Sequence, residues 1–343
     1  MLYYDGTKLL SLQDINGNKP ELYICTANRT AGKTTYFGRL LVNRWKDKKE
    51  KFGLIYRFNY ELSDVAEKFF KDIKVLFFPG LNMTSRTCAR GSFVELSIND
   101  EVCGYAISLN NADQLKKYSH MFSDIKRLLF DEFQSETGKY CNKEIEKFIS
   151  VHTSISRGRG EHVRYVPVYM VGNPVTILNP YYIELGITDR LRMDTRYLKG
   201  PGFVLEQGFV DSAAEAQKTT GFYKAFAFNK YVAYSAESVY LNDTDAFLEK
   251  PDGRSRYIAT LRYNGKDFAI REFPDRGLIY CDDSADASFP VRLVTTTDDH
   301  QANYVLLSGT SHYIAAMRKY FTMGCFRFKN QLCKSAVISA FRI

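Results

Sequence analysis

The feature that most constrains the fold of this chain is the eight-residue segment 27–34, which reads Ala-Asn-Arg-Thr-Ala-Gly-Lys-Thr. An apolar run at 22–25 precedes it and predicts a buried strand, while the residues from 33 to 45 have the pattern of a helix. Except for alanine at the first glycine position, the segment has the spacing G-x-x-x-x-G-K-[ST] of a phosphate-binding loop. We therefore expect a strand, loop and helix that together bind phosphate.

The residue types in this segment suit a nucleoside triphosphate and Mg²⁺. Backbone N–H groups of the loop and of the helix N-terminus would face the phosphates, and Gly32 would allow close approach. Lys33 would reach the β and γ oxygens, the Thr34 hydroxyl would bind Mg²⁺, and Arg29 adds a second positive charge. Each residue of the segment is a candidate for nucleotide binding: Ala27, Asn28, Arg29, Thr30, Ala31, Gly32, Lys33 and Thr34.

Two later strand ends fit the same site. The apolar run 125–130 ends in Asp131 and Glu132, so Asp131 would hold Mg²⁺ through water and Glu132 would polarise the attacking water. The alternative is an exposed acidic pair that merely ends a core strand. A third strand, at 166–171, leads to Asn173, which could sense the γ-phosphate or simply form an Asn-Pro turn.

Basic residues elsewhere are candidates for acting on a neighbouring subunit. The loop 156–160 carries Arg157 and Arg159, and an arginine on such a loop can reach a neighbour's γ-phosphate. The same loop could instead bind a nucleic-acid backbone. Lys116 and Lys117 precede the strand at 125–130 and could be presented in the same way, although paired lysines commonly form a solvated face.

The pattern along the chain predicts two domains. Strands alternate with helices over residues 1–199, which indicates an α/β domain with a mostly parallel sheet. Gly200-Pro201-Gly202 interrupts this pattern, so we expect a linker over 200–228, with one polar helix at 212–218, and a smaller α+β domain over 229–343. Local patterns further predict a helix at 62–70, a strand at 73–78 and a strand at 231–240.

Charge is unevenly distributed along the 343 residues, whose 47 basic and 39 acidic side chains give a net charge of +8. Residues 301–343 hold six basic side chains and no acidic one. Aromatic residues are interleaved there, which suits nucleic acid, or else an amphipathic strand pair packed on the core. No run approaches the ~18–20 apolar residues of a membrane span. The nucleic-acid candidates are Arg318, Lys319, Arg327 and Lys329.

With Arg29 four positions before Lys33, an Asp131–Glu132 pair after a strand and a Gly-Asn strand end, residues 20–200 resemble the large-terminase class of viral DNA-packaging ATPases. The length and layout are most similar to the encapsidation proteins of small phi-29-like phages. The resemblance implies a P-loop domain of the ASCE type, which has an additional strand and a catalytic glutamate and hydrolyses ATP with Mg²⁺. It also implies a homomeric ring, pentameric by that resemblance, that works in the host cytoplasm at the portal of a procapsid and pumps double-stranded DNA inward.

The same resemblance assigns roles to individual residues. It assigns binding of the phosphates and Mg²⁺ to Lys33 and Thr34. It assigns binding of Mg²⁺ to Asp131 and activation of the attacking water to Glu132. The trans-acting arginine is expected at Arg157 or Arg159. It further implies that the second domain is RNase H-like, lacks nuclease activity and docks on the portal or on a structural packaging RNA.

Two other functions stay open. One is a terminase-type ATPase with an active metal-dependent nuclease, which needs several converging carboxylates. The nearest candidates are Asp282, Asp283 and Asp286, with Asp243, Asp245, Asp298 and Asp299 elsewhere. The other is a helicase or recombination ATPase, which would stack single-stranded bases on aromatic side chains.

Overall fold

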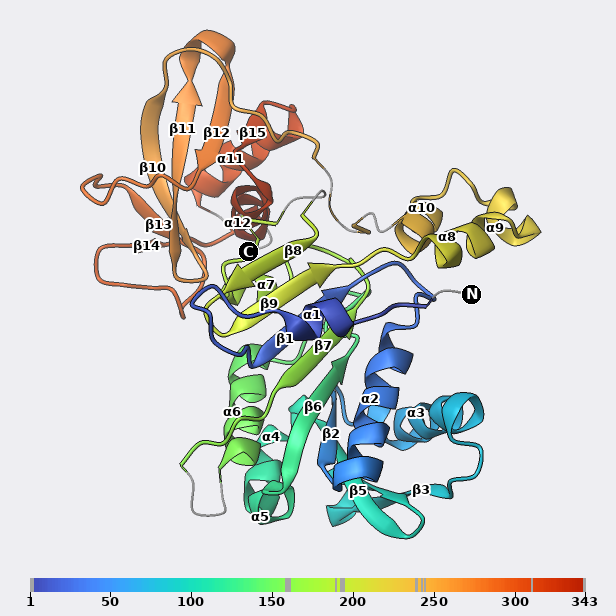
Figure 1. Cartoon of the computed structure of the whole chain (residues 1–343). Coiled ribbons are helices and arrows are strands. Elements are labelled where there is room, and N and C mark those ends of the chain that lie inside the picture. The colour runs from blue at the N-terminus through green and yellow to red at the C-terminus, as the bar shows by residue number, and fades with distance from the viewer. Residues whose placement is uncertain are drawn as a thin grey trace. The chain divides into compact units, whose positions relative to one another are not determined.

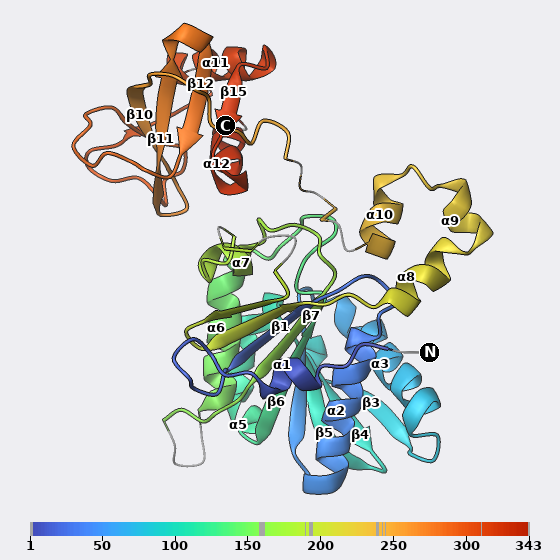
Figure 2. The same cartoon turned by 45° about the horizontal axis from the view of Figure 1, so that its top comes forward.

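The computed structural model describes residues 3–157, 162–188, 190–191, 195–237, 240–241, 243, 245–309 and 311–341. The chain divides into two compact units (Figures 1 and 2). The first unit comprises residues 1–185 and 191–242, and the second comprises residues 186–190 and 243–343.

In the described residues of the first unit, a nine-stranded sheet forms the centre and has the order β3-β4-β5-β2-β6-β7-β1-β9-β8. The strands from β5 to β9 in this order are parallel, whereas β3, β4 and β8 pair antiparallel with their neighbours. The expected mostly parallel α/β sheet is thus confirmed. The strands are β1 Leu22–Thr26, β2 Lys51–Tyr56, β3 Met83–Cys88, β4 Phe93–Ile98, β5 Glu101–Ser108, β6 Ile125–Asp131, β7 Val168–Gly172, β8 Tyr197–Gly200 and β9 Phe203–Gln207.

Helices cover both faces of this sheet, which explains why its central strands are continuously apolar. On one face Phe37 of α2 (Lys33–Lys48) stacks on Tyr169 of β7, with ring centroids 5.0 Å apart. On the other face Phe148 of α6 (Glu144–Ser156) stacks on Phe130 of β6 at 5.8 Å. The shorter helices of this unit are α1 Thr7–Ser11, α4 Ala112–Leu115, α5 Ser119–Phe122, α7 Pro180–Glu184, α8 Asp211–Lys218, α9 Gly221–Ala225 and α10 Lys230–Glu237.

The sheet order brings three strand ends together. β7 lies between β1 and β6 and is parallel to both, although it follows them in the chain. Because parallel strands end at the same edge, the loops after β1, β6 and β7 meet there. The sheet therefore has the additional strand that the sequence led us to expect between the phosphate loop and the acidic pair.

Two local predictions were wrong. The expected helix at 62–70 is confirmed, but the expected strand at 73–78 continues it as one helix, α3 (Glu61–Phe77), because Leu62, Phe69 and Ile73 bury one face at helical spacing. In place of the expected strand at 231–240, residues 231–237 belong to the helix α10 (Lys230–Glu237), which buries Tyr234 and Ala236. In short apolar runs of this kind, periodicity alone does not distinguish a strand from a buried helix.

The expected boundaries of the domains also need correction. The segment 200–228 is not a free linker, because β9 pairs along its length with β1 and its Phe203, Val204 and Leu205 are buried. Gly202, with φ of +73°, makes the turn between β8 and β9 rather than a break between domains. The first unit continues through α10 to residue 242.

The described residues of the second unit form a six-stranded sheet with the order β14-β13-β10-β11-β12-β15. Phe321 of α11 (His312–Thr322) and Phe341 of α12 (Gln331–Phe341) pack on Phe326 of β15 and cover one face. Among the described helices of the chain, none combines the length and apolar character that crossing a bilayer requires. The strands of this unit are β10 Arg256–Tyr263, β11 Lys266–Phe273, β12 Leu278–Asp282, β13 Arg292–Val294, β14 Val305–Leu306 and β15 Phe326–Phe328.

Candidate nucleotide site

Lys33 is the first residue of α2, directly after the loop that follows β1. Its buried ammonium group donates hydrogen bonds to the carbonyls of Ala27 at 2.9 Å and Asn28 at 3.0 Å, and to Asn173 Oδ1 at 3.1 Å. Burial lowers the pKa of Lys33 to about 8, while the nearby Asp131 acts in the opposite direction. The lysine is thus held over the loop at the N-terminus of a sixteen-residue helix, where an anion is favoured.

The backbone of the loop explains why alanine is accepted at its first position. Ala27 is not among the residues with positive φ, so it needs no glycine, and its side chain is buried against Gly208. Gly32, in contrast, has a φ of +87° as the N-cap of α2. Thr30 also has a positive φ, and its hydroxyl accepts a hydrogen bond from Gln217 of α8.

The side chains of Thr34 and Asp131 meet at the sheet edge. Thr34 Oγ1 donates to Asp131 Oδ1 at 3.1 Å, and the backbone N–H of Glu132 donates to the same oxygen at 3.0 Å. Burial raises the pKa of Asp131 to about 6, and the neighbouring Glu132 carboxylate adds to the rise. A hydroxyl and a carboxylate are hard oxygen ligands, so this donor pair fits Mg²⁺.

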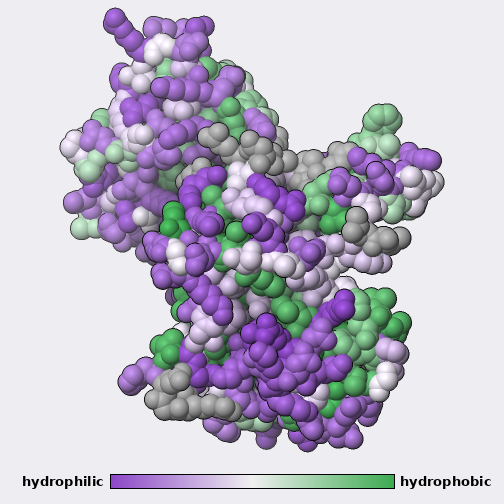
Figure 3. All heavy atoms as spheres, viewed as in Figure 1, coloured by the Kyte–Doolittle hydropathy of each residue, from purple (hydrophilic) through white to green (hydrophobic). Residues whose placement is uncertain are grey.

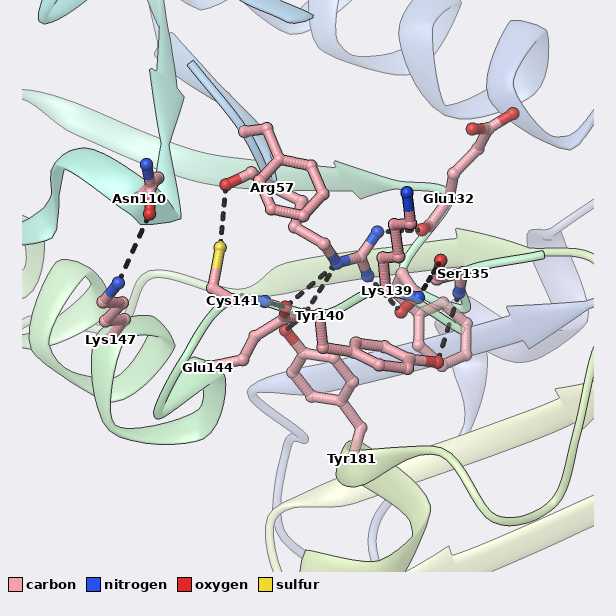
Figure 4. Close-up of polar contacts among 12 residues, drawn as sticks. Arg57, Asn110, Glu132, Ser135, Lys139, Tyr140, Cys141, Glu144, Lys147 and Tyr181 are labelled. Carbon is pink, nitrogen blue, oxygen red and sulfur yellow. Dashed lines mark hydrogen bonds and ion pairs between the residues drawn. The ribbon is translucent and has the colours of Figure 1, made fainter. Parts of the chain in front are cut away.

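Glu132 adopts a strained backbone conformation directly after β6. Its φ is +50°, a region that costs a non-glycine residue about 1–3 kcal/mol. Figure 4 shows its carboxylate pointing away from the side chains of Arg57 and Glu144. The turn thereby separates the two neighbouring acids, so that Asp131 faces Thr34 while Glu132 is exposed.

Arg57, the residue after β2, supports this turn from behind (Figure 4). Its guanidinium donates to the carbonyl of Glu132 at 3.3 Å and to that of Phe133 at 2.7 Å. It also forms a buried ion pair with Glu144 of α6 at 3.0 Å, the side chains being 6% and 2% exposed. Glu144 in turn accepts hydrogen bonds from the Tyr181 hydroxyl at 2.8 Å and the Cys141 N–H at 2.7 Å.

Arg29 points toward acidic and aromatic groups on the outer side of the loop. It forms an ion pair with Glu136 at 3.2 Å and contacts the hydroxyl of Tyr231 on α10. Glu136 also accepts a hydrogen bond from the Tyr234 hydroxyl at 2.7 Å. The backbone N–H of Arg29 donates to the carbonyl of Ser235, so α10 is attached to the loop at several points.

The remaining loop residues have structural partners. The Asn28 side chain exchanges two hydrogen bonds with the backbone of Val210, at 3.1 and 3.0 Å. The carbonyl of Ala31 accepts from the N–H of Tyr4 at 2.8 Å. The structure thus brings together Lys33, Thr34, Asp131, Glu132 and Asn173, and anchors the loop through Asn28 and Ala31.

The candidates for acting on a neighbour lie away from this cluster. Arg157 ends α6 and donates to the Thr153 carbonyl at 3.2 Å, and Lys116 pairs with Asp113 at 2.9 Å. Lys117 is exposed. Ser156, the residue before Arg157, accepts a hydrogen bond from Arg164, whose guanidinium binds the carbonyl of Ile125 at the start of β6. Arg157 therefore lies near the edge where the parallel strands begin, whereas the phosphate loop follows the opposite edge. Arg159 lies outside the described residues.

The basic candidates of the second unit are engaged within that unit. Arg327 pairs with Glu249 at 2.8 Å, Lys329 contacts Asp283, and Arg318 contacts the carbonyl of Phe341. Lys319 lies on the same helix as Arg318. These side chains come from α11, from β15 and from the residue that follows β15, and they do not form one strip along a tail, because the segment folds as helix, strand and helix.

The acidic residues proposed for a nuclease are also dispersed. Asp282 pairs with Arg271 at 2.7 Å, and Asp286 accepts a hydrogen bond from the Ser288 hydroxyl. Asp299 binds the backbone N–H groups of Asn264 and Gly265 at 2.7 Å. Within the described part of the chain, no three His, Cys, Asp or Glu side chains gather as a metal site.

Sequence reasoning missed Arg57, Glu144 and Glu136. A charged residue directly after the apolar run of β2 was a signal for Arg57, because strand ends at this edge face the site. Glu144 and Glu136 had no comparable signal, since each is defined by partners far away in the chain.

Comparisons with known proteins agree over the whole length of the chain. A family model described as Podovirus DNA encapsidation protein (Gp16) matches residues 1–343. The DNA packaging protein of Bacillus phage phi29 is 24% identical over 346 residues, which cover 99% of this chain and 97% of that protein. The DNA packaging protein of Bacillus phage B103 is 24% identical over 318 residues, covering 92% and 94%.

Solved structures support the fold. A chain in the bacteriophage phi-29 viral genome packaging motor assembly has a TM-score of 0.73 and 21% identity, covering 100% of this chain and 99% of that one. A chain in the Phi-28 gp11 DNA packaging motor has a TM-score of 0.63 and 16% identity, covering 99% and 97%. Since the family model spans residues 1–343, this chain belongs to the Podovirus DNA encapsidation protein (Gp16) family.

Proposed function

We propose that this chain is a Mg²⁺-dependent ATPase that drives double-stranded DNA into a viral procapsid as one subunit of a homomeric ring. The observation that carries the proposal is the meeting of Lys33, Thr34, Asp131 and Glu132 at one sheet edge, in a chain of the DNA encapsidation family. The similarity to the DNA packaging protein of phage phi29 and to a chain of the phi-29 genome packaging motor assembly supports the same assignment.

Each residue of the site has a chemical task in this proposal. Backbone N–H groups of the loop, the start of α2 and Lys33 would bind the β- and γ-phosphates. Thr34 and Asp131 would hold Mg²⁺, which when bound neutralises phosphate charge. Glu132 would accept a proton from the attacking water, and Asn173, hydrogen-bonded to Lys33 at 3.1 Å, would orient the γ-phosphate.

Arg29 would link nucleotide binding to the helices that precede the second unit. Phosphate oxygens would compete with Glu136 for its guanidinium, because both are anions within reach of the loop. Release from Glu136 would also loosen the contacts of Tyr231 and Tyr234 on α10, whose helix leads toward the second unit. This offers a physical route from hydrolysis to movement of DNA.

Hydrolysis would take place between subunits of the ring. Arg157, Arg159, Lys116 and Lys117 are the candidates for reaching a neighbour's nucleotide, and the position of Arg157 opposite the phosphate loop supports an action in trans rather than in cis. Mixing Arg157→Ala subunits, and separately Arg159→Ala subunits, with Glu132→Gln subunits tests this proposal. Recovered hydrolysis in one mixture identifies the arginine that acts across the interface, whereas additive loss in both argues against trans action.

The second unit would be an RNase H-like domain that docks on the portal or on a structural packaging RNA. Its sheet order supports this proposal: three antiparallel strands, β10, β11 and β12, are extended beside β10 by the parallel strands β13 and β14. Binding of nucleic acid would fall to Arg318, Lys319, Arg327 and Lys329. The pairing of Asp282 with Arg271 and of Asp283 with Lys329 favours docking over nuclease activity.

Steady-state ATP hydrolysis by the purified full chain, with and without duplex DNA, tests the proposed function. We expect duplex DNA to stimulate hydrolysis and Lys33→Ala to abolish it. If Lys33→Ala hydrolyses ATP like the wild type, the assignment of the phosphate loop is wrong. If DNA has no effect while hydrolysis depends on Lys33, the chain is an ATPase but the coupling to DNA is refuted.

A further inference from the structure

We propose that the groove between α3 and β3, the edge strand of the large sheet, binds the phosphate backbone of duplex DNA. This inference rests on the proposed function and adds a DNA contact on the first unit to the basic residues of the second. The groove has a volume of about 750 Å³. It is lined by Lys68, Phe70, Lys71 and Lys74 of α3 and by Met83, Thr84 and Ser85 of β3.

The three lysines of the groove keep their positive charge without a counter-ion. Within the part of the chain that the structure describes, none of them forms an ion pair or a side-chain hydrogen bond, and no carboxylate lines the groove. Asp72 lies on the same helix but lines a different cavity. Other basic side chains are paired, as Lys51 is with Asp124 at 2.8 Å. Like charges around one groove repel each other, so an anion between them is favoured.

The lysines of the groove lie on one side of α3. Positions 68, 71 and 74 are three residues apart, so neighbouring lysines follow one another on the helix surface and together span about 9 Å of its axis. The other side of α3 is apolar: Leu76 and Phe77 line a separate cavity against α2. Figure 3 shows hydrophobic residues at the surface over α3. The positive charge therefore forms a strip toward β3 and does not surround the helix.

The polar groups of the groove suit phosphates and not base edges. Lysine ammonium groups and the hydroxyls of Thr84 and Ser85 are donors of the kind that contact DNA phosphates. Arg, Asn and Gln side chains, which commonly read base edges, are absent from the described residues that line the groove. The groove can therefore hold DNA of any sequence, which a packaging motor requires because the whole genome passes through it.

Lys68 connects the groove with the nucleotide site. Its side chain lines the groove and also a cavity of about 120 Å³ whose walls include Thr34 and Asp131. DNA bound in the groove would therefore be separated from the proposed Mg²⁺ ligands by a single lysine side chain. A phosphate that draws Lys68 toward the groove changes the charge next to Asp131, which gives bound DNA a physical route to affect hydrolysis.

Binding of a short duplex of mixed sequence to the full chain, measured by fluorescence anisotropy at several KCl concentrations, tests the groove. Each phosphate contact adds about 0.9 to the slope of log K against log salt. We expect the triple variant Lys68→Ala/Lys71→Ala/Lys74→Ala to lower this slope by about 2–3 and to weaken binding about 10- to 100-fold at low salt. The corresponding triple Arg variant keeps the charge and should retain the wild-type slope.

Three exposed lysines elsewhere in the first unit supply a matched control. Lys8, Lys46 and Lys48 do not line the groove, so Lys8→Ala/Lys46→Ala/Lys48→Ala removes the same charge and should change the slope by less than about 1. An equal fall of the slope in both Ala variants would reveal only an effect of net charge and overturn the inference. A wild-type slope in the groove variant would overturn it as well.

A competition experiment distinguishes DNA from an acidic polypeptide as the occupant of the groove. Polyglutamate should displace the duplex no better than its charge predicts, because the groove is proposed to bind phosphates. If polyglutamate binds more tightly than the duplex, and the groove variant loses that binding, the groove serves an acidic protein and the proposal is wrong. If the wild type binds no duplex at all, the proposed function fails and the DNA groove with it.

Discussion

Replacement of Arg57 is the sharpest test of how this fold supports its candidate site. The guanidinium connects three elements: the end of β2, the turn after β6 and the start of α6. Arg57→Ala removes the partner of Glu144, whose side chain is 2% exposed, and the donors to two carbonyls of the turn. Arg57→Lys keeps the charge but cannot reproduce the forked geometry.

The expected magnitudes follow from burial. Breaking a buried ion pair by removing one partner costs about 3–5 kcal/mol, because the remaining charge loses its counter-ion. In Arg57→Ala the Glu144 carboxylate keeps only neutral donors, the Tyr181 hydroxyl and the Cys141 N–H. Arg57→Lys can retain the pair with Glu144, so it should lose mainly the hydrogen bonds to Glu132 and Phe133, worth about 1–3 kcal/mol together. Because the turn positions Glu132, a shift of about 1 Å there should reduce kcat by about 10- to 100-fold in the Lys variant.

Urea unfolding of the full chain and single-turnover ATP hydrolysis measure the two effects separately. Glu101→Ala is the matched control, since Glu101 pairs with Lys49 and the two side chains are 62% and 59% exposed. The control should leave both the unfolding midpoint and the rate nearly unchanged. If Arg57→Ala unfolds at the same urea concentration as Glu101→Ala, the buried pair does not stabilise the fold. If Arg57→Lys hydrolyses ATP at the wild-type rate, Arg57 does not position Glu132.

Further predictions concern single contacts. Glu136→Gln should bind ADP ~2- to 5-fold more tightly by calorimetry, because the half-buried Arg29 loses a competing ion pair; weaker binding would contradict this. Gly104→Ala should destabilise the first unit by about 1–3 kcal/mol in urea, because its Cβ would lie 2.2 Å from the Phe52 carbonyl, whereas Gly80→Ala, with open space around it, should not. Stimulation of hydrolysis by DNA should fall steeply as salt rises, since a sequence-independent grip depends on phosphate contacts; a flat salt profile would refute that grip.

The phosphate loop and the acidic strand end could be predicted from the sequence because each depends on residues that are neighbours in the chain. In segment 27–34 the positions of Gly32, Lys33 and Thr34 relative to one another are set by chain connectivity. Asp131 and Glu132 directly follow a continuous apolar run, and a strand buried on both faces requires such a run. That these two segments share a sheet edge also followed, because parallel strands end at one edge.

The tertiary structure alone decided which distant residues support the loop. Arg57 and Glu144 are separated by 87 positions, and Arg29 reaches Glu136 across 107 positions, so no local spacing reveals either pair. The conformation of residues 231–237 was decided in the same way, since burial of Tyr234 favours a helix where the residue pattern alone suits a strand. Short apolar segments gain little from their own propensity, and their conformation is chosen by the surface on which they pack.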